Sequence, residues 1–347
     1  MPQLVQEYQI DQKTGKTLTH DVPMPDDDPL LCKVSLPLQA VFYPLGFAVE
    51  ISTNSQSVLD AAEESWGALR QRYAGSPLRL RIGVVETGPE ECPPAPVARA
   101  QRHLLSIVAN SHNQAICDLR EGFAFVWVNR SAVRHRSYLR YHFLESVALV
   151  LLSTSYVVPI HAACVSRYGC GMLLCGTSGA GKSSLAYGCA RSGWTYTSDD
   201  ASYLLRDGDR PRIIGNSRQF RFRHSAKALF PELRGRDLTP RAQGKPSIEV
   251  PISDFPRIVT AEEATPRYII FLNRRTSKTA ELRPLSSEIA MEYFCQNVYP
   301  TEEIGQMQIA ALEYLSTMQA YELSYSTLSQ AVDRLERLAR SSGVQVI

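Results

Sequence analysis

The feature that most constrains the fold is the glycine-rich segment Gly176–Ser183, which fits the pattern G-x-x-x-x-G-K-[ST] of phosphate-binding loops. The apolar run Met172–Cys175 before it predicts a short buried strand, and Ser184–Arg191 after it predicts a helix. A phosphate-binding loop requires this order of strand, loop and helix. The alternative is a glycine-rich turn that merely joins a strand to a helix, but the full motif with the correct flanks favours a nucleotide site.

In this interpretation the loop binds a nucleoside triphosphate mainly through its backbone. Gly176, Gly179 and Gly181 allow backbone angles that a Cβ atom disfavours, so several N–H groups can converge on phosphate oxygens. The positive end of the following helix adds to the attraction. Lys182 would reach the β- and γ-phosphates, and the Ser183 hydroxyl would bind Mg²⁺. The expected phosphate-binding residues are Gly176, Thr177, Ser178, Gly179, Ala180, Gly181, Lys182, Ser183 and Ser184.

The composition is that of a globular protein. The chain has 347 residues, of which 44% are hydrophobic and 21% charged, so it is long enough for two packed domains. Its net charge of +2 is too balanced to indicate nucleic acid or an anionic membrane as the main partner. The longest apolar run, Val147–Ile160, is too short for a membrane span and predicts a core helix that leads into a strand.

The cysteines indicate a reducing environment. None of the eight forms a C-x-x-C pair or a zinc spacing with histidine, and several lie inside apolar runs. We therefore expect reduced core thiols in a cytoplasmic protein.

The order of elements predicts an α/β protein in three segments. We expect residues 1–30 to form a flexible arm and residues 31–133 to form a small N-terminal α/β domain. Residues 134–347 should form the domain that carries the loop. The last of these would begin with a long helix at Arg134–Ser155. The elements expected in the N-terminal domain are two strands within Cys32–Ile51, a helix at Ser55–Arg72, a strand at Leu78–Glu86 and a meander at Leu104–Ala109, Gln114–Asp118 and Phe123–Val128.

A second feature with chemical potential is the acidic pair Asp199–Asp200, which follows the predicted strand Trp194–Ser198. Two acids at the end of a strand just beyond a phosphate-binding loop are where a metal ligand or a catalytic base belongs. A helix-capping role is disfavoured because Ala201–Leu205 continues as a strand. Adjacent carboxylates on a strand point to opposite faces, so we expect one to face the γ-phosphate and the other the metal or a neighbouring strand.

These motifs together resemble the catalytic domain of HPr kinase/phosphorylase, a family similar in fold to ATP-dependent phosphoenolpyruvate carboxykinase. A buried strand at Val157–Val165 and a Gly169-Cys-Gly turn precede the loop, so a hairpin feeds it, which is uncommon among phosphate-binding loops. The resemblance covers about residues 157–205 and rests on His161-Ala-Ala, this turn, the loop and the acidic pair. It predicts a P-loop kinase domain of the HPr-kinase and carboxykinase type, preceded in the chain by a smaller N-terminal α/β domain.

The resemblance also implies the roles of single residues, with ATP and Mg²⁺ as cofactors. Lys182 would bind phosphate and Ser183 the metal, Asp200 would be the general base on the acceptor hydroxyl, and Asp199 would lie beside the metal. His161 would be an active-site residue near the transferred phosphoryl group, although a histidine in a buried strand is by itself more often a core residue. Members of the family form symmetric assemblies, which leaves room for a homo-oligomer here.

The chain departs from the bifunctional members of the family after the acidic pair. Those enzymes have a glycine-rich signature with a metal-binding Glu, whereas Gly215–His224 contains no Glu and is followed by a predicted helix at Ser225–Leu233. This departure argues against HPr as the substrate and against the phosphorylase reaction. Arg218, Arg221 and Arg223 in this segment predict either a basic ridge that binds substrate or phosphate, or a solvated edge.

Several functions stay open on the sequence alone. The favoured one is transfer of the γ-phosphoryl group of ATP to a hydroxyl, with a Ser of a protein or peptide other than HPr as acceptor. The family also places a basic residue near the phosphates, for which Lys245 is a candidate. A kinase of a small molecule, such as an amino acid or a sugar, would use the same site, whereas a non-catalytic nucleotide-binding regulator would need no base. A DNA-associated ATPase is disfavoured because no basic domain is visible.

Overall fold

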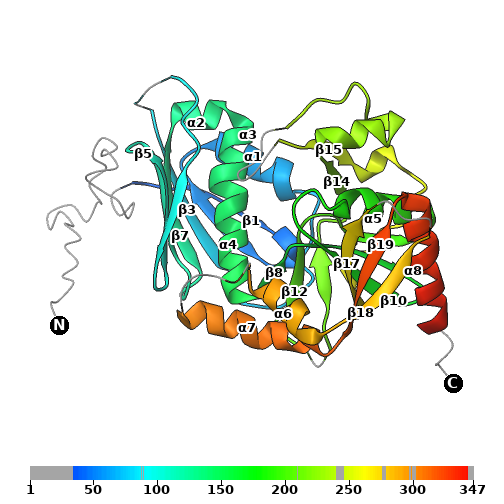
Figure 1. Ribbon diagram of the computed structural model, residues 1–347. Helices are drawn as coiled ribbons and strands as arrows, with labels where there is room; N and C mark the ends of the chain where they lie inside the picture. Colours follow the sequence, from blue (N-terminus) through cyan, green and yellow to red (C-terminus); the bar gives the residue numbers. More distant parts are fainter. Residues whose placement is uncertain are drawn as a thin grey trace, which may run out of the picture. The chain divides into compact units, whose positions relative to one another are not determined.

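The computed structural model describes residues 34–86, 88, 90–208, 210–239, 246–275, 279–296, 298 and 302–342. They form a mixed α/β structure with several sheets that divides into two compact units (Figure 1). The first unit comprises the described residues up to 99 and residues 105–148, and the second comprises residues 100–104 and those from 149 onward. The predicted arm at residues 1–30 and the candidate Lys245 lie outside the described residues.

The first unit is built on a seven-stranded sheet in the order β1-β2-β3-β7-β6-β5-β4. Strand β3 pairs in parallel with β2 on one side and with β7 on the other, and β7 pairs antiparallel with β6. The predicted strands are confirmed, but β4 was not predicted because all of its residues are exposed and it has no apolar face. The strands are β1 Leu38–Phe42, β2 Val49–Thr53, β3 Leu78–Val85, β4 Val97–Gln101, β5 Leu104–Asn110, β6 Asn113–Asp118 and β7 Phe123–Asn129.

Helix α1 (Gln56–Trp66) packs on β1 and β2, with the Trp66 ring 6.1 Å from that of Phe42. It ends before the predicted Arg72, at Gly67, whose low helix propensity disfavours a further turn. The Gly67 N–H still bonds to the Glu63 carbonyl at 2.8 Å. The long helix predicted to start at Arg134 starts earlier, with α2. Its start is set by Asn129, whose side chain accepts a hydrogen bond from the Ala132 N–H. Its parts are α2 Arg130–Arg134, α3 Arg136–Tyr138, a π-helical turn at Leu139–Glu145 and α4 Ser146–Ser155.

The second unit is built around a six-stranded sheet in the order β11-β9-β10-β17-β19-β18. Strands β10, β17 and β19 run parallel, whereas β9, β11 and β18 run antiparallel to their neighbours. The predicted hairpin before the glycine-rich loop is thereby confirmed, since β9 and β10 are its two arms. The strands are β9 Ala162–Arg167, β10 Cys170–Cys175, β11 Thr195–Ser198, β17 Pro266–Arg274, β18 Glu281–Leu285 and β19 Gln319–Tyr325.

Helices cover both faces of this sheet, which explains why β10 reads as an unbroken apolar run. Alternate residues of β10 enter different cores: Met172 and Leu174 lie with helices α5 and α8, whereas Leu173 and Cys175 lie with α6 and α7. All residues of β10 are buried as a result. The helices are α5 Lys182–Arg191, α6 Ser287–Cys295, α7 Glu302–Ser316 and α8 Leu328–Ser342.

A four-stranded sheet and a two-stranded sheet complete the second unit, in the orders β16-β13-β12-β8 and β14-β15. The predicted helix at Ser225–Leu233 is wrong: the segment forms two short 3₁₀ turns, His224–Ala228 and Pro231–Leu233. Pro231 disfavours helical geometry in the residue before it, and Phe230 is extended. The strands are β8 Val157–Ile160, β12 Ser202–Leu205, β13 Ile213–Gly215, β14 Gln219–Phe222, β15 Ile248–Pro251 and β16 Glu263–Ala264.

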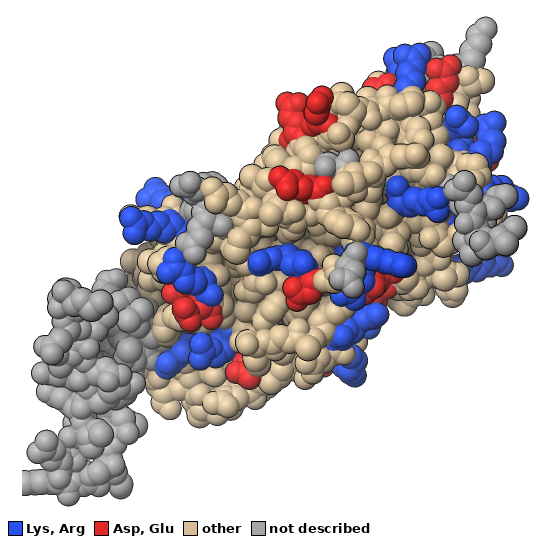
Figure 2. Space-filling model, turned by 90° about the horizontal axis from the view of Figure 1, so that it is seen from below, with Lys and Arg blue, Asp and Glu red and all other residues tan. Residues whose placement is uncertain are grey.

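The surface carries charges of both signs. On the face shown in Figure 2, Lys and Arg side chains are interspersed with acidic and uncharged residues. Every cysteine that the structure describes is a free thiol, and burial raises the pKa of Cys117 and Cys164 to about 12. Within the described ranges, no helix combines the length and the apolar character that crossing a membrane would need.

Candidate functional site

The glycine-rich loop connects the end of β10 to the start of α5 through backbone angles that glycine favours. Gly176 and Gly181 have φ angles of 147° and 99°. A Cβ atom on Gly176 would lie 2.9 Å from the Cβ of Ala180, and one on Gly181 would lie 3.1 Å from the Tyr325 hydroxyl. Both glycines are therefore required by close contact as well as by conformation.

Two tyrosines from distant elements hold this loop. The Tyr293 hydroxyl, on α6, accepts a hydrogen bond from the Gly176 N–H at 3.0 Å. It also lies within donating distance of the carbonyls of Gly176 and His161, at 2.9 Å and 2.7 Å. At the other end of the loop, the Tyr325 hydroxyl on β19 donates to the Ala180 carbonyl at 3.4 Å. The loop is thus fixed at its entry and exit by two tyrosines that no sequence motif indicates.

Lys182 lies at the base of the loop and is almost completely buried, with 5% of its surface exposed. Its Nζ donates to the carbonyls of Gly176 and Thr177 at 2.7 Å and 3.3 Å, and it lies 2.9 Å from His161 Nε2. Burial lowers the pKa of Lys182, and the negative charge of Asp200 opposes this shift. Lys182 therefore has fixed partners that orient it toward the loop.

The contact with His161 extends from Lys182 to Asp200. A protonated lysine can only donate hydrogen bonds, so beside an ammonium group His161 Nε2 accepts and a neutral ring has its proton on Nδ1. His161 Nδ1 is 3.7 Å from Asp200 Oδ1, which is longer than a hydrogen bond. The side chains of His161 and Asp200 are 35% and 24% exposed, so solvent or a ligand can reach both. The structure thus brings the predicted residues Lys182, His161 and Asp200 into one row.

The topology explains why His161 and Asp200 meet. The strand predicted at Val157–Val165 is in fact broken at His161, because β8 belongs to the four-stranded sheet and β9 to the six-stranded sheet. The next strand pair makes the same change, since β11 pairs with β9 whereas β12 pairs with β8. The acidic pair occupies this second break, so it lies in a bend between sheets and not within a continuous strand.

The side chains of the acidic pair diverge. Asp199 is 7% exposed, and its Oδ2 accepts a hydrogen bond from the Arg221 N–H on β14. The Ser183 hydroxyl donates to the Asp199 carbonyl at 3.3 Å, so Ser183 is next to the acidic pair. Asp200 instead faces His161. One acid therefore contacts a neighbouring strand, and the other lies beside the lysine and histidine.

The three arginines predicted as a basic ridge have different partners. Arg218 lies 3.7 Å from Glu262, and Arg221 forms an ion pair of 3.0 Å with Glu249. Arg223 Nη2 donates to the Ser178 hydroxyl in the loop at 3.3 Å. Only Arg223 of these three therefore adds a positive charge next to the glycine-rich loop.

The residues present fit a nucleoside triphosphate. The loop leads into the N-terminus of α5, and a Cβ on Gly179 would meet no atom within 4 Å, so its outer side is open. Lys182 and Arg223 supply positive charge at the same place. The oxygens of Ser183, Asp199 and Asp200 are the donor type that Mg²⁺ prefers. The described residues contain no group of three or more His, Cys, Asp or Glu arranged around a metal ion, but Mg²⁺ takes most of its ligands from phosphates and water.

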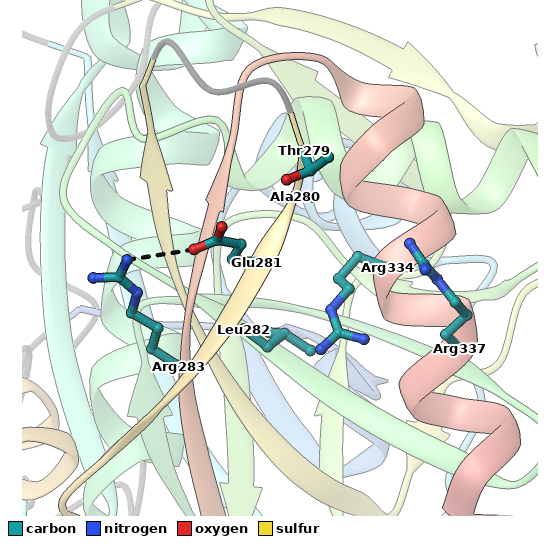
Figure 3. A pocket seen from close by; sticks show the side chains of 7 residues that line it. All are labelled: Thr279, Ala280, Glu281, Leu282, Arg283, Arg334 and Arg337. Atoms are coloured by element: carbon teal, nitrogen blue, oxygen red, sulfur yellow. Dashed lines mark hydrogen bonds and ion pairs between the residues drawn. The ribbon is translucent and has the colours of Figure 1, made fainter.

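Another cationic region lies between β18 and α8, where a hollow of about 350 Å³ opens on the surface (Figure 3). Its lining includes none of the residues of the loop, His161 or the acidic pair. Arg283 pairs with Glu281 at 3.3 Å, while Arg334 and Arg337 extend from α8. The lining residues are Thr279, Ala280, Glu281, Leu282, Arg283, Arg334 and Arg337.

Comparisons with known proteins give little further information. No family model matches the chain, and no curated protein matches it. Among solved structures, a similar one is that of the Hpr(Ser) kinase/phosphatase from Coxiella burnetii, at 14% sequence identity and a TM-score of 0.29. The match covers 53% of this chain and 98% of that chain. A TM-score this low indicates only a weak relationship in fold, and it does not establish a shared family, activity or substrate.

Proposed function

We propose that this protein is a kinase that uses ATP and Mg²⁺ to transfer the γ-phosphoryl group to a hydroxyl, with a Ser side chain of a protein or peptide other than HPr as acceptor. The observation that carries the proposal is the row of Lys182, His161 and Asp200 beside a glycine-rich loop. A loop that only joined a strand to a helix would need neither a buried lysine nor a carboxylate beside it.

The loop and Lys182 would bind the phosphates. The loop leads into the N-terminus of α5, where phosphate oxygens can replace the carbonyls of Gly176 and Thr177 as partners of the Lys182 ammonium. Arg223 adds a second positive charge beside Ser178. Such fixed charges stabilise the negative charge that spreads over the phosphoryl oxygens during transfer. Bound Mg²⁺, held by Ser183 and Asp199, would supply further charge neutralisation.

Asp200 would act as the general base. Its carboxylate takes the proton of the acceptor hydroxyl while the new O–P bond forms and the bond between the γ-phosphorus and the bridging oxygen of ADP breaks. General-base catalysis of this kind contributes about a hundred- to ten-thousand-fold in rate. His161, whose Nδ1 is 3.7 Å from Asp200 Oδ1, would lie beside the base and the transferred phosphoryl group.

Replacement of Asp200 by Asn tests this proposal. Asn has the same shape but cannot accept the proton, so D200N should bind ATP like the parent and transfer phosphoryl at least about a hundredfold more slowly. The assay uses γ-labelled ATP with a native lysate, followed by identification of the labelled species. D207N is the matched control, since Asp207 is exposed and in the same unit, and it should transfer at the parental rate.

The remaining outcomes separate the alternatives. Label on a free amino acid or sugar would identify a small-molecule kinase with the same site. Tight ATP binding by the parent without transfer to any component of the lysate would identify a nucleotide-binding regulator. Unchanged transfer by D200N would contradict the role of Asp200.

A further inference from the structure

An arginine that the sequence analysis did not single out lies at the same edge of the sheet as the glycine-rich loop. Strand β17 runs parallel to β10, with Phe271 opposite Cys175, and continues to Arg274 after β10 has ended. Arg274 is therefore beyond the carboxyl end of the strand that enters the loop. Ligands of open α/β sheets bind outside the carboxyl ends of their parallel strands, which makes this position a candidate for ligand contact.

The direction of the Arg274 side chain follows from the alternation along β17. Ile270 and Leu272 lie in the core that α5 and α8 share, so Arg274 projects to the same face. Arg274 is opposite Tyr325 in the register of β17 and β19, and the Tyr325 hydroxyl contacts the Ala180 carbonyl in the loop. Burial raises the pKa of Tyr325 and the positive charge of Arg274 opposes that rise, in keeping with their proximity.

Arg274 and the next residue, Arg275, differ in their hydrogen-bond and ion-pair partners. Arg275 is held by Glu322 at 3.1 Å and by the Ser324 hydroxyl. No hydrogen bond or ion pair joins the exposed Arg274 guanidinium to the described part of the chain. The two adjacent arginines thus carry the same charge, but among the described residues only Arg275 has such partners, which leaves the exposed Arg274 guanidinium to a ligand.

The strand order places Arg274 on one flank of the loop and the reacting groups on the other. β9 and β17 are the two neighbours of β10, and His161 immediately precedes β9. If the γ-phosphoryl group lies beside His161 and Asp200, the rest of the nucleotide extends toward β17. We infer that Arg274 binds the α- or β-phosphate of the nucleotide, on the flank of the loop opposite the acceptor hydroxyl. This inference rests on the proposed function.

Nucleotide binding by R274A tests this inference. A charge-assisted contact to a phosphate present in both ATP and ADP should contribute equally to each, so R274A should weaken ATP and ADP binding by the same factor, about tenfold. The KM for ATP should rise by that factor, with kcat unchanged at saturating ATP, because the contact is remote from the transferred group. R274K keeps the charge without the planar fork, so its affinities for ATP and ADP should lie between those of R274A and the parent.

R275A is the matched control, because it removes the same charge from the next residue. It should bind ATP and ADP like the parent, and thermal unfolding of both variants should show that they are folded. R274A that binds ADP as tightly as R275A overturns the inference, and so does a fall in kcat with unchanged KM. If the parent itself binds no nucleotide, the proposed function fails together with this inference, whereas parental binding with an unaffected R274A overturns the inference alone.

Discussion

Two regions of the second unit collect positive charge, and they are built in opposite ways. At the glycine-rich loop, Lys182 is buried and held by two backbone carbonyls and by His161. In the hollow between β18 and α8, Arg337 and Arg283 are exposed, and Arg337 bonds back to the Asp333 carbonyl of its own helix at 3.3 Å. The first region fixes a cation before any ligand arrives, whereas Arg283 and Arg337 of the second are exposed to water.

The difference matters because an exposed charge gains little from an anion. Solvent screens the interaction, and ordering a long side chain opposes it, so exposed ion pairs contribute about 0–1 kcal/mol. A buried cation that is already desolvated and oriented interacts more strongly with incoming phosphate. We therefore expect a nucleotide to bind at the loop and not in the hollow, although the hollow has more arginines.

We expect the largest effect on phosphoryl transfer from Lys182→Met, and a double replacement in the hollow is the variant to compare with it. Met keeps the apolar stem but has no charge, so phosphoryl transfer should fall by about a hundred- to a thousandfold. Arg334→Ser with Arg337→Ser should leave transfer and ATP affinity at the parental level. Transfer rates and ATP binding check both variants, and thermal unfolding checks that they are folded. An equal loss in the double variant would remove the distinction between the two regions.

The sequence sufficed for the part of the site that is local in the chain. The apolar run of β10, the glycine pattern and the start of α5 are consecutive, and each has its own short-range signal. The hairpin of β9 and β10 was predicted for the same reason, since its turn lies at Gly169. These short-range signals were enough to place Lys182 and Ser183 at the start of α5.

The sequence did not suffice where distant strands choose their partners. Strand propensity does not indicate which sheet a strand joins, so the breaks at His161 and at Asp199–Asp200 had no local signal. The approach of His161 to Asp200 was accordingly implied only by the resemblance to a family. Tyr293 is 117 residues from Gly176 and lies in a helix whose pattern indicates only burial, so its hydroxyl contact could not be predicted.

A smaller effect should separate two glycines within the loop. Gly179 and Gly181 have φ angles of 90° and 99°, so alanine at either position is strained and should cost about 1–3 kcal/mol of unfolding free energy. Only at Gly181 would the new Cβ also meet the Tyr325 hydroxyl, at 3.1 Å. G181A should therefore be the more destabilised variant in urea unfolding, and adding Tyr325→Phe should recover the difference. Equal losses would show that the Tyr325 contact does not crowd the loop.

The smallest expected effect concerns the tyrosine that joins the loop to His161. In Tyr293→Phe the Gly176 N–H loses its partner, which should lower the unfolding free energy by about 1 kcal/mol, measured by urea unfolding. Tyr321→Phe is the control, because the Tyr321 hydroxyl donates to the exposed Gln319 side chain at 3.2 Å, and its loss should stay below about 0.5 kcal/mol. ATP affinity should fall in Tyr293→Phe alone, since only this hydroxyl fixes the entry to the loop. Equal stability and equal affinity in the two variants would mean that β10 and α5 hold the loop without help from α6.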